Sequence, residues 1–289
     1  MIASGVEPRR SWEMRRGLVP LEQPAVVGIV NLTPDSFSDG GKYLEPDRAL
    51  TRAEELVAQG AAMLDLGAES TRPGTEAPVP EDDEWRRLEP ALTAVVARFP
   101  GVPVSVDTVK SGVARRALDA GAWAINDVSG LRLDPAIADA CAAAGAGLIL
   151  MHSRGDVRTM ATYQHASYRD VAGEVGEELE AAVSRAVGRG VPPERIVLDP
   201  GLGFAKTPEQ SYEALRGVPA LARKGHAVMI GPSRKRFLGA ATGRDVSQRD
   251  VATAAACALG WVLGARLFRV HEVGPTRDAL AVACATGVA

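Results

Sequence analysis

The segment Val26-Val-Gly-Ile-Val30 is a continuous apolar run, and the polar string Asn31-Leu-Thr-Pro-Asp35 follows it directly. A run in which every position is apolar, rather than every second one, is typical of a parallel strand that is covered on both faces. Residues 47–59 then show helical spacing of apolar side chains and stop before Gly60, and residues 63–66 form a second apolar run. The stretch 26–66 therefore predicts a strand, a crossover helix and a second, parallel strand.

The same unit repeats along the chain. Further apolar runs lie at 102–106, 123–125, 148–151, 196–198, 227–230 and 266–270, and helical spacing recurs at 81–98, 110–120, 134–144, 168–188, 207–223, 250–263 and 275–286. Asp134-Pro135 and Thr207-Pro208 have the cap and first-turn proline of a helix start. Eight strands alternating with eight helices predict an α/β protein folded as a single (β/α)8 TIM barrel.

The predicted barrel domain covers residues 25–289, and residues 1–24 are expected to form an irregular or hairpin plug before it. An open doubly wound sheet is the alternative fold. Its dinucleotide-binding form normally has a GxGxxG string after the first strand, and here the first predicted strand ends in Asn31-Leu-Thr-Pro instead. The barrel is therefore the preferred prediction.

Composition limits the kinds of function. The 289 residues have a formal net charge of −3 and only 4% aromatic residues, which argues against a nucleic-acid partner bound through a basic surface or a base-stacking platform. The three cysteines form no CxxC pair, as is typical of a reducing compartment. The first 17 residues lack the apolar stretch of a secretory signal, and the apolar segment 251–267 contains Arg266, so no membrane span is predicted. We expect a cytoplasmic protein.

Polar groups follow every predicted strand. In a barrel, catalytic groups lie at the carboxyl ends of the strands and in the loops after them. In strand order, these positions hold Asn31 and Asp35, then Thr71 and Arg72, Asp107, Asn126, Met151 with His152, Asp199, Ser233 with Lys235 and Arg236, and finally Arg269 with His271. One polar residue at a strand end is often a helix cap. Eight strand ends of this kind are hard to explain by capping alone.

One set of these residues suits a flat heterocycle. Asp107, Asn126 and Asp199 offer carboxylate and amide groups to a ring that presents adjacent N–H donors and a carbonyl. Either aspartate could instead cap the helix that follows it, although Asp199 is separated from the next predicted helix by a glycine-rich turn. The sequence leaves both interpretations open.

A second set is cationic and suits a phosphate or diphosphate. Its members are Arg72, Lys235, Arg269 and His271. Only five of the 33 basic residues are lysines, so a lysine at 235, between two arginines, indicates a need for a compact ammonium group; a solvated basic turn is the alternative. No His/Cys spacing predicts a zinc site, and no nucleophile elbow or P-loop occurs. Group transfer by positioning and charge neutralisation is the expected chemistry.

Seven strings, in this order along residues 26–285, closely resemble dihydropteroate synthase, the folate-pathway enzyme family that sulfonamides inhibit. They are NLTPDSFSDGG at 31–41, GAESTRPG at 67–74, VDT at 106–108, INDVSG at 125–130, DPGLGF at 199–204, SRKRF at 233–237 and RVH at 269–271. The resemblance implies a transferase that condenses 6-hydroxymethyl-7,8-dihydropterin diphosphate with p-aminobenzoate. The products are 7,8-dihydropteroate and diphosphate, formed by dissociative loss of diphosphate.

The resemblance also implies the roles of individual residues. Those expected to bind the pterin substrate are Thr71, Asp107, Asn126, Met151, Asp199, Phe204, Gly231, Lys235, Arg269 and His271. Those expected near p-aminobenzoate are Phe37, Arg72, Pro73, Ser233 and Arg236, and those expected to act in catalysis are Lys235, Arg269, His271, Asp35 and Arg72. Asn31 is expected to be the protein ligand of a Mg²⁺ cofactor that holds the diphosphate. The family further implies a homodimer formed through the last barrel helices.

Two other functions remain open at this point. A catalytically silent pterin-binding paralogue is expected to lose Asn31, Asp35 or Arg269, and all three are present. A pterin-dependent methyltransferase barrel would need neither the loop 31–41 nor the turn 233–235. The chain departs from the family at Ala205, where a glycine is common. Because the segments 31–41 and 71–73 look unaltered, we expect sulfonamides to inhibit this protein.

Overall fold

The computed structural model describes residues 9–32, 46–70 and 78–287. Its centre is a closed barrel of eight parallel strands in the order in which they occur along the chain. They are β3 (Ala25–Asn31), β4 (Met63–Gly67), β5 (Val104–Asp107), β6 (Ala124–Asp127), β7 (Gly147–Met151), β8 (Ile196–Asp199), β9 (Ala227–Ile230) and β10 (Leu267–Val270). Pairing of β10 with β3 closes the barrel. The predicted (β/α)8 fold is confirmed.

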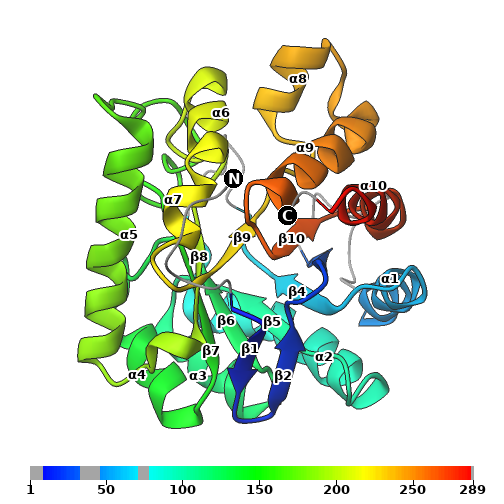
Figure 1. Ribbon diagram of the computed structural model, residues 1–289. Helices are drawn as coiled ribbons and strands as arrows, with labels where there is room; N and C mark the ends of the chain where they lie inside the picture. Colours follow the sequence, from blue (N-terminus) through cyan, green and yellow to red (C-terminus); the bar gives the residue numbers. More distant parts are fainter. Residues whose placement is uncertain (1–8, 33–45, 71–77, 288–289) are drawn as a thin grey trace.

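Helices surround these strands (Figure 1). They are α1 (Pro46–Ala58), α2 (Glu81–Arg98), α3 (Ser111–Asp119), α4 (Ala136–Ala144), α5 (Val171–Gly188), α6 (Pro208–Arg216), α7 (Val218–Ala222), α8 (Arg236–Thr242), α9 (Asp250–Val262) and α10 (Val273–Ala285), with short 3-10 turns at Pro193–Arg195 and Val246–Gln248. The strands and the larger helices agree with the predicted ranges to within a few residues.

One predicted helix is wrong, and one observed helix was not predicted. The range 207–223, expected as one helix, is two helices that meet at Gly217. Pro219 explains the break, because its ring would collide with the carbonyl of residue 215 in a continuous helix. Helix α8 was not predicted, since its seven residues are too few to show a period.

Both predicted helix starts have a physical basis in the structure. The Thr207 hydroxyl accepts the backbone N–H of Gln210 at 3.3 Å, and the Gln210 side chain accepts the Thr207 N–H at 2.9 Å, so the two form a capping box. The Asp134 carboxylate accepts the N–H of Ala136 at 3.0 Å, and α4 begins at that residue. The same carboxylate accepts the N–H of Ser111 at 2.7 Å, so it caps α3 as well.

An antiparallel hairpin, β1 (Ser11–Met14) and β2 (Gly17–Pro20), precedes the barrel, as expected for the plug (blue in Figure 1). Trp12 and Val19 are buried and pack against the barrel's inward-facing apolar residues, including Met63 and Ile149. The Trp12 indole also donates to the carbonyl of Arg195 at 2.8 Å, just before β8 begins. The hairpin therefore covers the amino-terminal end of the barrel. The division of the chain at residue 25 stays a prediction.

The apolar segment 251–267 lies in α9 and the start of β10, as expected. Within the ranges described, no helix is both long enough and apolar enough to cross a membrane.

Candidate active site

Eight of the predicted site residues lie at one end of the barrel, because each stands at or next to the carboxyl end of a strand. Asn31, Asp107, Met151 and Asp199 are the last residues of β3, β5, β7 and β8; Asn126 is the last but one of β6; Gly231 and His271 directly follow β9 and β10; and Arg269 lies in β10. Five other predicted site residues lie outside the described residues: Asp35, Phe37, Thr71, Arg72 and Pro73.

Arg269 is the electrostatic centre of this end. Its Nε lies 2.5 Å from Asp65 Oδ2, and its Nη2 lies 2.8 Å from Asp107 Oδ2. These carboxylates raise the pKa of Arg269, although its burial opposes them. Burial raises the pKa of Asp107, and the carboxylate of Asp65 adds to the effect, whereas Arg269 opposes it. Arg269 therefore stays charged and binds two carboxylates even without a substrate anion.

Asp65 was not found by the sequence reasoning. It lies in the middle of β4, it is buried, and its Oδ1 also accepts the Ser105 hydroxyl at 2.6 Å. The signal that could have found it is a lone carboxylate within an otherwise apolar strand, because a buried charge needs a partner. That partner is Arg269, whose position 204 residues later was not visible from spacing.

Asn126 is oriented by Asp65. Its Nδ2 donates to Asp65 Oδ2 at 3.2 Å, which assigns the other terminal atom, Oδ1, as the free acceptor. Oδ1 is buried and has no hydrogen-bond partner among the residues described. A buried polar atom without a partner is costly, so this oxygen is suited to accept an N–H from a ligand.

Asp199 and Lys235 form the other side of the site. Burial raises the pKa of Asp199, and the positive charges of Lys235 and Arg269 oppose this. Burial lowers the pKa of Lys235 to about 7, although Asp199 opposes the shift. The Lys235 Nζ donates to the Leu202 carbonyl and lies 4.3 Å from the centre of the Phe204 ring. The ammonium is thus held between a carbonyl and an aromatic face.

Neither aspartate caps a helix, and residues 234–236 have separate partners. Asp107 pairs with Arg269, and the Asp199 carboxylate accepts the N–H of Gly201 at 2.7 Å, well before α6 begins, so neither caps a helix. The basic residues 234–236 do not form one solvated patch. Arg234 pairs with Asp250 at 2.7 and 2.8 Å, and the exposed Arg236 donates to the Ala161 carbonyl.

Ser233, His271 and Asn31 form a row across the ends of β9, β10 and β3. The Ser233 hydroxyl lies 2.8 Å from His271 Nδ1 and also accepts the backbone N–H of His271 at 3.1 Å. On the other edge of the ring, Nε2 lies 3.5 Å from Asn31 Nδ2. Ser233, which was expected near p-aminobenzoate, therefore orients His271.

Within the described ranges, no group of three or more His, Cys, Asp or Glu side chains could hold a metal ion. A metal at this end would depend on the amide oxygen of Asn31, since the Asn31 Nδ2 is directed to His271. One protein oxygen fits Mg²⁺, which retains several waters and takes oxygens from substrate phosphates. The donor set therefore agrees with a magnesium ion that arrives with a phosphorylated substrate.

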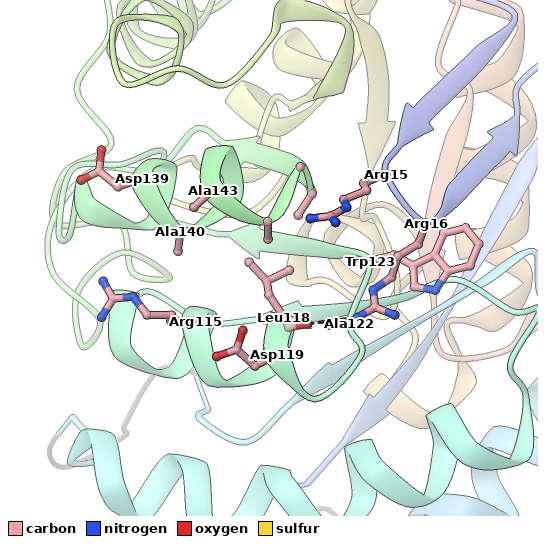
Figure 2. A pocket seen from close by; sticks show the side chains of 13 residues that line it. Arg15, Arg16, Arg115, Leu118, Asp119, Ala122, Trp123, Asp139, Ala140 and Ala143 are labelled. Atoms are coloured by element: carbon pink, nitrogen blue, oxygen red, sulfur yellow. Dashed lines mark hydrogen bonds between the residues drawn. The ribbon is translucent and has the colours of Figure 1, made fainter.

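A hollow of about 880 Å³ lies elsewhere, between α3 and α4 (Figure 2). Its lining includes Arg15 and Arg16 from the turn of the hairpin, Arg115 from α3 and small residues of α4 such as Ala140. None of the strand-end residues described above line it. This hollow is therefore separate from the candidate active site at the carboxyl ends of the strands.

Comparisons with known proteins identify the family of this chain. The profile of the pterin binding enzyme family matches residues 27–271. Dihydropteroate synthase from Mycobacterium leprae is 45% identical over 263 residues, which cover 89% of this chain and 91% of that protein.

Two solved structures have the same fold over nearly their whole length. Xanthomonas albilineans dihydropteroate synthase with 4-aminobenzoic acid is 40% identical with a TM-score of 0.89, covering 97% of this chain and 99% of the other. Yersinia pestis dihydropteroate synthase in a sulfonamide drug complex is 35% identical, also with a TM-score of 0.89, covering 96% and 100%. With a matching profile, curated relatives and solved structures in agreement, the chain belongs to the pterin binding enzymes and, among them, to the dihydropteroate synthases.

Proposed function

We propose that the carboxyl end of this barrel carries out the dihydropteroate synthase reaction with the residue roles given below. In that reaction 6-hydroxymethyl-7,8-dihydropterin diphosphate and p-aminobenzoate give 7,8-dihydropteroate and diphosphate. The observation that carries the proposal is Asn126 Oδ1, which is buried and has no hydrogen-bond partner in the part of the chain that the structure describes. It lies on a strand between those that end in Asp107 and Met151. An acceptor fixed in this way, with the buried Asp199 and the half-buried Asp107 at the same end, suits the N–H donors of a pterin.

The pterin ring would be bound by three acceptors and one cation. Asn126, Asp107 and Asp199 accept its N–H groups, and Lys235 donates to a ring acceptor in place of the Leu202 carbonyl. Met151 and Phe204 line the faces of the ring. Gly231 lies beside Asp199, since a Cβ there would lie 3.9 Å from Asp199 Oδ2. Thr71 stays a predicted contact.

Arg269 and His271 would anchor the diphosphate. Arg269 remains charged beside its carboxylates, and Ser233 orients the His271 ring toward Asn31. Asn31 would hold Mg²⁺, which when bound supplies positive charge to the diphosphate oxygens. Asp35 and Arg72 stay predicted contributors to catalysis.

The expected reaction is dissociative. The bond between the exocyclic methylene carbon and the diphosphate oxygen breaks, and its electron pair leaves with the diphosphate. The electron-rich dihydropterin delocalises the positive charge on the methylene, the neutral amine of p-aminobenzoate attacks this carbon, and the amine then loses a proton. Lys235, Arg269 and His271 stabilise the departing charge, and electrostatic stabilisation of this kind is usually the largest single contribution to a rate.

The second substrate would bind beside the diphosphate. Ser233 and Arg236 are the described candidates, and Phe37, Arg72 and Pro73 complete the predicted set. The Xanthomonas albilineans and Yersinia pestis structures contain 4-aminobenzoic acid and a sulfonamide, respectively, in relatives with the same fold. They support p-aminobenzoate as substrate and sulfonamides as inhibitors of this chain.

The proposed function is tested by mixing the protein with pterin diphosphate, p-aminobenzoate and Mg²⁺ and measuring diphosphate release. We expect release only when all components are present, and a sulfonamide should compete with p-aminobenzoate. Binding of the pterin without release would instead identify a silent paralogue. Turnover that is unaffected by sulfonamide would contradict the predicted inhibition.

The assembly and location are also proposals. On α9 and α10, Val251, Leu259 and Val282 are 80%, 60% and 69% exposed, and such apolar side chains support a homodimer formed through these helices. Light scattering should give twice the chain mass, and Val251→Lys with Leu259→Lys should give the monomer. Cys141, Cys257 and Cys284 are all free, which supports a reducing, cytoplasmic location.

A further inference from the structure

A buried lysine outside the predicted site lies directly behind the turn that bears Phe204. Lys206 is only 1% exposed, and its Nζ lies 2.8 Å from His152 Nδ1, 3.2 Å from the Gly201 carbonyl oxygen and 3.2 Å from the Phe204 carbonyl oxygen. An ammonium group has three N–H donors, and each has an acceptor here. The ammonium therefore joins β7's end to two positions of the turn after β8.

His152 is itself held in one protonation state. Its Nε2 lies 3.0 Å from Glu178 Oε2 on α5, while Nδ1 faces the Lys206 ammonium. Burial lowers the pKa of His152 to about 4, and Lys206 adds to the effect, so the ring is neutral at pH 7. A neutral ring that accepts at Nδ1 must donate from Nε2, which matches Glu178 as its partner. Glu178, His152 and Lys206 thus form one continuous chain of hydrogen bonds.

The turn that Lys206 contacts has unfavourable backbone φ angles. Gly201, Gly203 and Ala205 have φ angles of +66°, +77° and +45°, and a residue with a Cβ rarely adopts this region. A Cβ at Gly201 would lie 1.9 Å from the His152 carbonyl oxygen, so the turn approaches β7's end closely. Side-chain contacts must hold the turn in this shape. Lys206, which follows Ala205, supplies two of them and is itself anchored outside the turn by His152.

Lys235 contacts the same turn. Lys235 donates to the Leu202 carbonyl and stacks on the Phe204 ring, while Lys206 donates to the carbonyls of Gly201 and Phe204. Resting on the proposed function, we propose that Lys206, held by His152 and Glu178, is a positioning residue that fixes the turn between Asp199 and Phe204 for the pterin.

The charge of Lys206 should also act on Asp199. Burial raises the pKa of Asp199, and three cations oppose it: Lys235 after β9, Arg269 in β10 and Lys206 before α6. Removing the charge of Lys206 should raise the pKa of Asp199 further. More of the carboxyl group is then protonated at a given pH and cannot accept an N–H from the pterin. Loss of the charge should therefore weaken pterin binding most on the acid side.

The test is steady-state kinetics of Lys206→Met in the holoenzyme with Mg²⁺, with each substrate varied between about pH 5 and 9. We expect the KM for pterin diphosphate to rise about tenfold or more, as for the loss of hydrogen bonds from a charged donor, and the KM for p-aminobenzoate to change less than about twofold. The acid limb of kcat/KM for the pterin should move to higher pH. Lys206→Arg, which keeps the charge, should return that limb toward its original position.

Lys224→Met is the matched control. Lys224 lies away from the site, and its Nζ is 2.5 Å from Glu180 Oε1. This variant should leave both KM values and the pH profile unchanged. If Lys206→Met does not fold, Glu178→Gln is the second variant. It removes the carboxylate that contacts both His152 and Arg154, leaves the charge of Arg154 to act on Lys206, and should raise the pterin KM about threefold.

The proposal is overturned if either variant lowers only thermal stability, or if it changes the KM of both substrates alike. Normal kinetics of Lys206→Met, together with an inactive Lys235→Ala, would overturn the positioning role and leave the proposed function intact. Absence of turnover in the unmodified protein would instead overturn the proposed function.

Discussion

The two ends of the barrel have opposite chemistry. At the amino-terminal end, Trp12 and Val19 of the hairpin fill the opening with apolar side chains. At the carboxyl end, Arg269 binds Asp65 and Asp107, and the charge of Asp199 partly offsets the effect of burial on the pKa of Lys235. One end removes apolar surface from water, and the other keeps charges buried at a cost in free energy. Stability and catalysis are therefore assigned to different ends of one set of strands.

The largest effect on stability is expected at the plug. Trp12→Ala should lower the free energy of unfolding by about 3–5 kcal/mol, because it removes a fully buried ring and its hydrogen bond to Arg195. Denaturant titration measures this loss. Below the unfolding transition, kcat per folded molecule should stay the same, since the site is at the far end.

Leu18→Ala on the same hairpin is the control, because Leu18 is 52% exposed and should change stability by less than about 0.5 kcal/mol. A fall in kcat for folded Trp12→Ala would show that the two ends are coupled.

The converse substitution is Lys235→Ala. It should raise the transition-state free energy by about 2–4 kcal/mol, a loss of about 30- to 1000-fold in kcat/KM for pterin diphosphate. Thermal stability should change little, because removing the ammonium also removes the cost of burying it. Lys224→Ala serves as the control. Normal turnover of Lys235→Ala would show that the assignment of the pterin site is wrong.

The pH dependence of catalysis is expected to report on Lys235 at the carboxyl end. Burial lowers the pKa of Lys235 to about 7, so the ammonium is lost as the pH rises through this value, and kcat/KM for the anionic substrate should then fall. Lys235→Arg retains its charge and should move this limb to higher pH. Burial also lowers the pKa of Lys206 to about 7, and the charge of Lys235 adds to this shift, so Lys206→Arg is measured alongside to separate the two lysines. An unmoved limb would assign the titration to another group.

The same pKa has the opposite effect on stability. The unfolded chain keeps the lysine proton up to about pH 10. Between about pH 7 and 10 the unfolded state therefore binds more protons, and this lysine makes the free energy of unfolding increase with pH. The free energy of unfolding, measured across that range, should show a smaller increase in Lys235→Ala.

The smallest effect is expected from Ser233→Ala. The hydroxyl contacts His271 Nδ1 at 2.8 Å and accepts its backbone N–H at 3.1 Å, so its loss should cost about 1 kcal/mol, or about fivefold in kcat. Ser11→Ala, which removes a 3.3 Å contact to Glu13 on the hairpin, should leave kcat unchanged. A change in the KM for p-aminobenzoate with kcat unaltered would instead favour direct contact of Ser233 with that substrate.

The sequence predicted the barrel because each buried parallel strand is a short, continuous apolar run that can be recognised locally. The rule that strand ends meet at one edge then brought Asp107, Asn126 and Asp199 together without any knowledge of distances. Asp65 and Lys206 escaped this reasoning, because each is defined by a partner on another element, Arg269 and His152. Pairing of this kind depends on the closed barrel and is not visible in local spacing.

The hairpin has a consequence for how the chain folds as it is made. Trp12 leaves the ribosome early, yet its hydrogen-bond partner Arg195 lies 183 residues later. At typical rates of synthesis, about 5–20 residues per second, that delay is about 10–40 s. Throughout that time an apolar indole has no barrel to enter, and the N-terminal segment is open to association with other chains. The hairpin is thus synthesised well before the barrel residues that it contacts in the native structure.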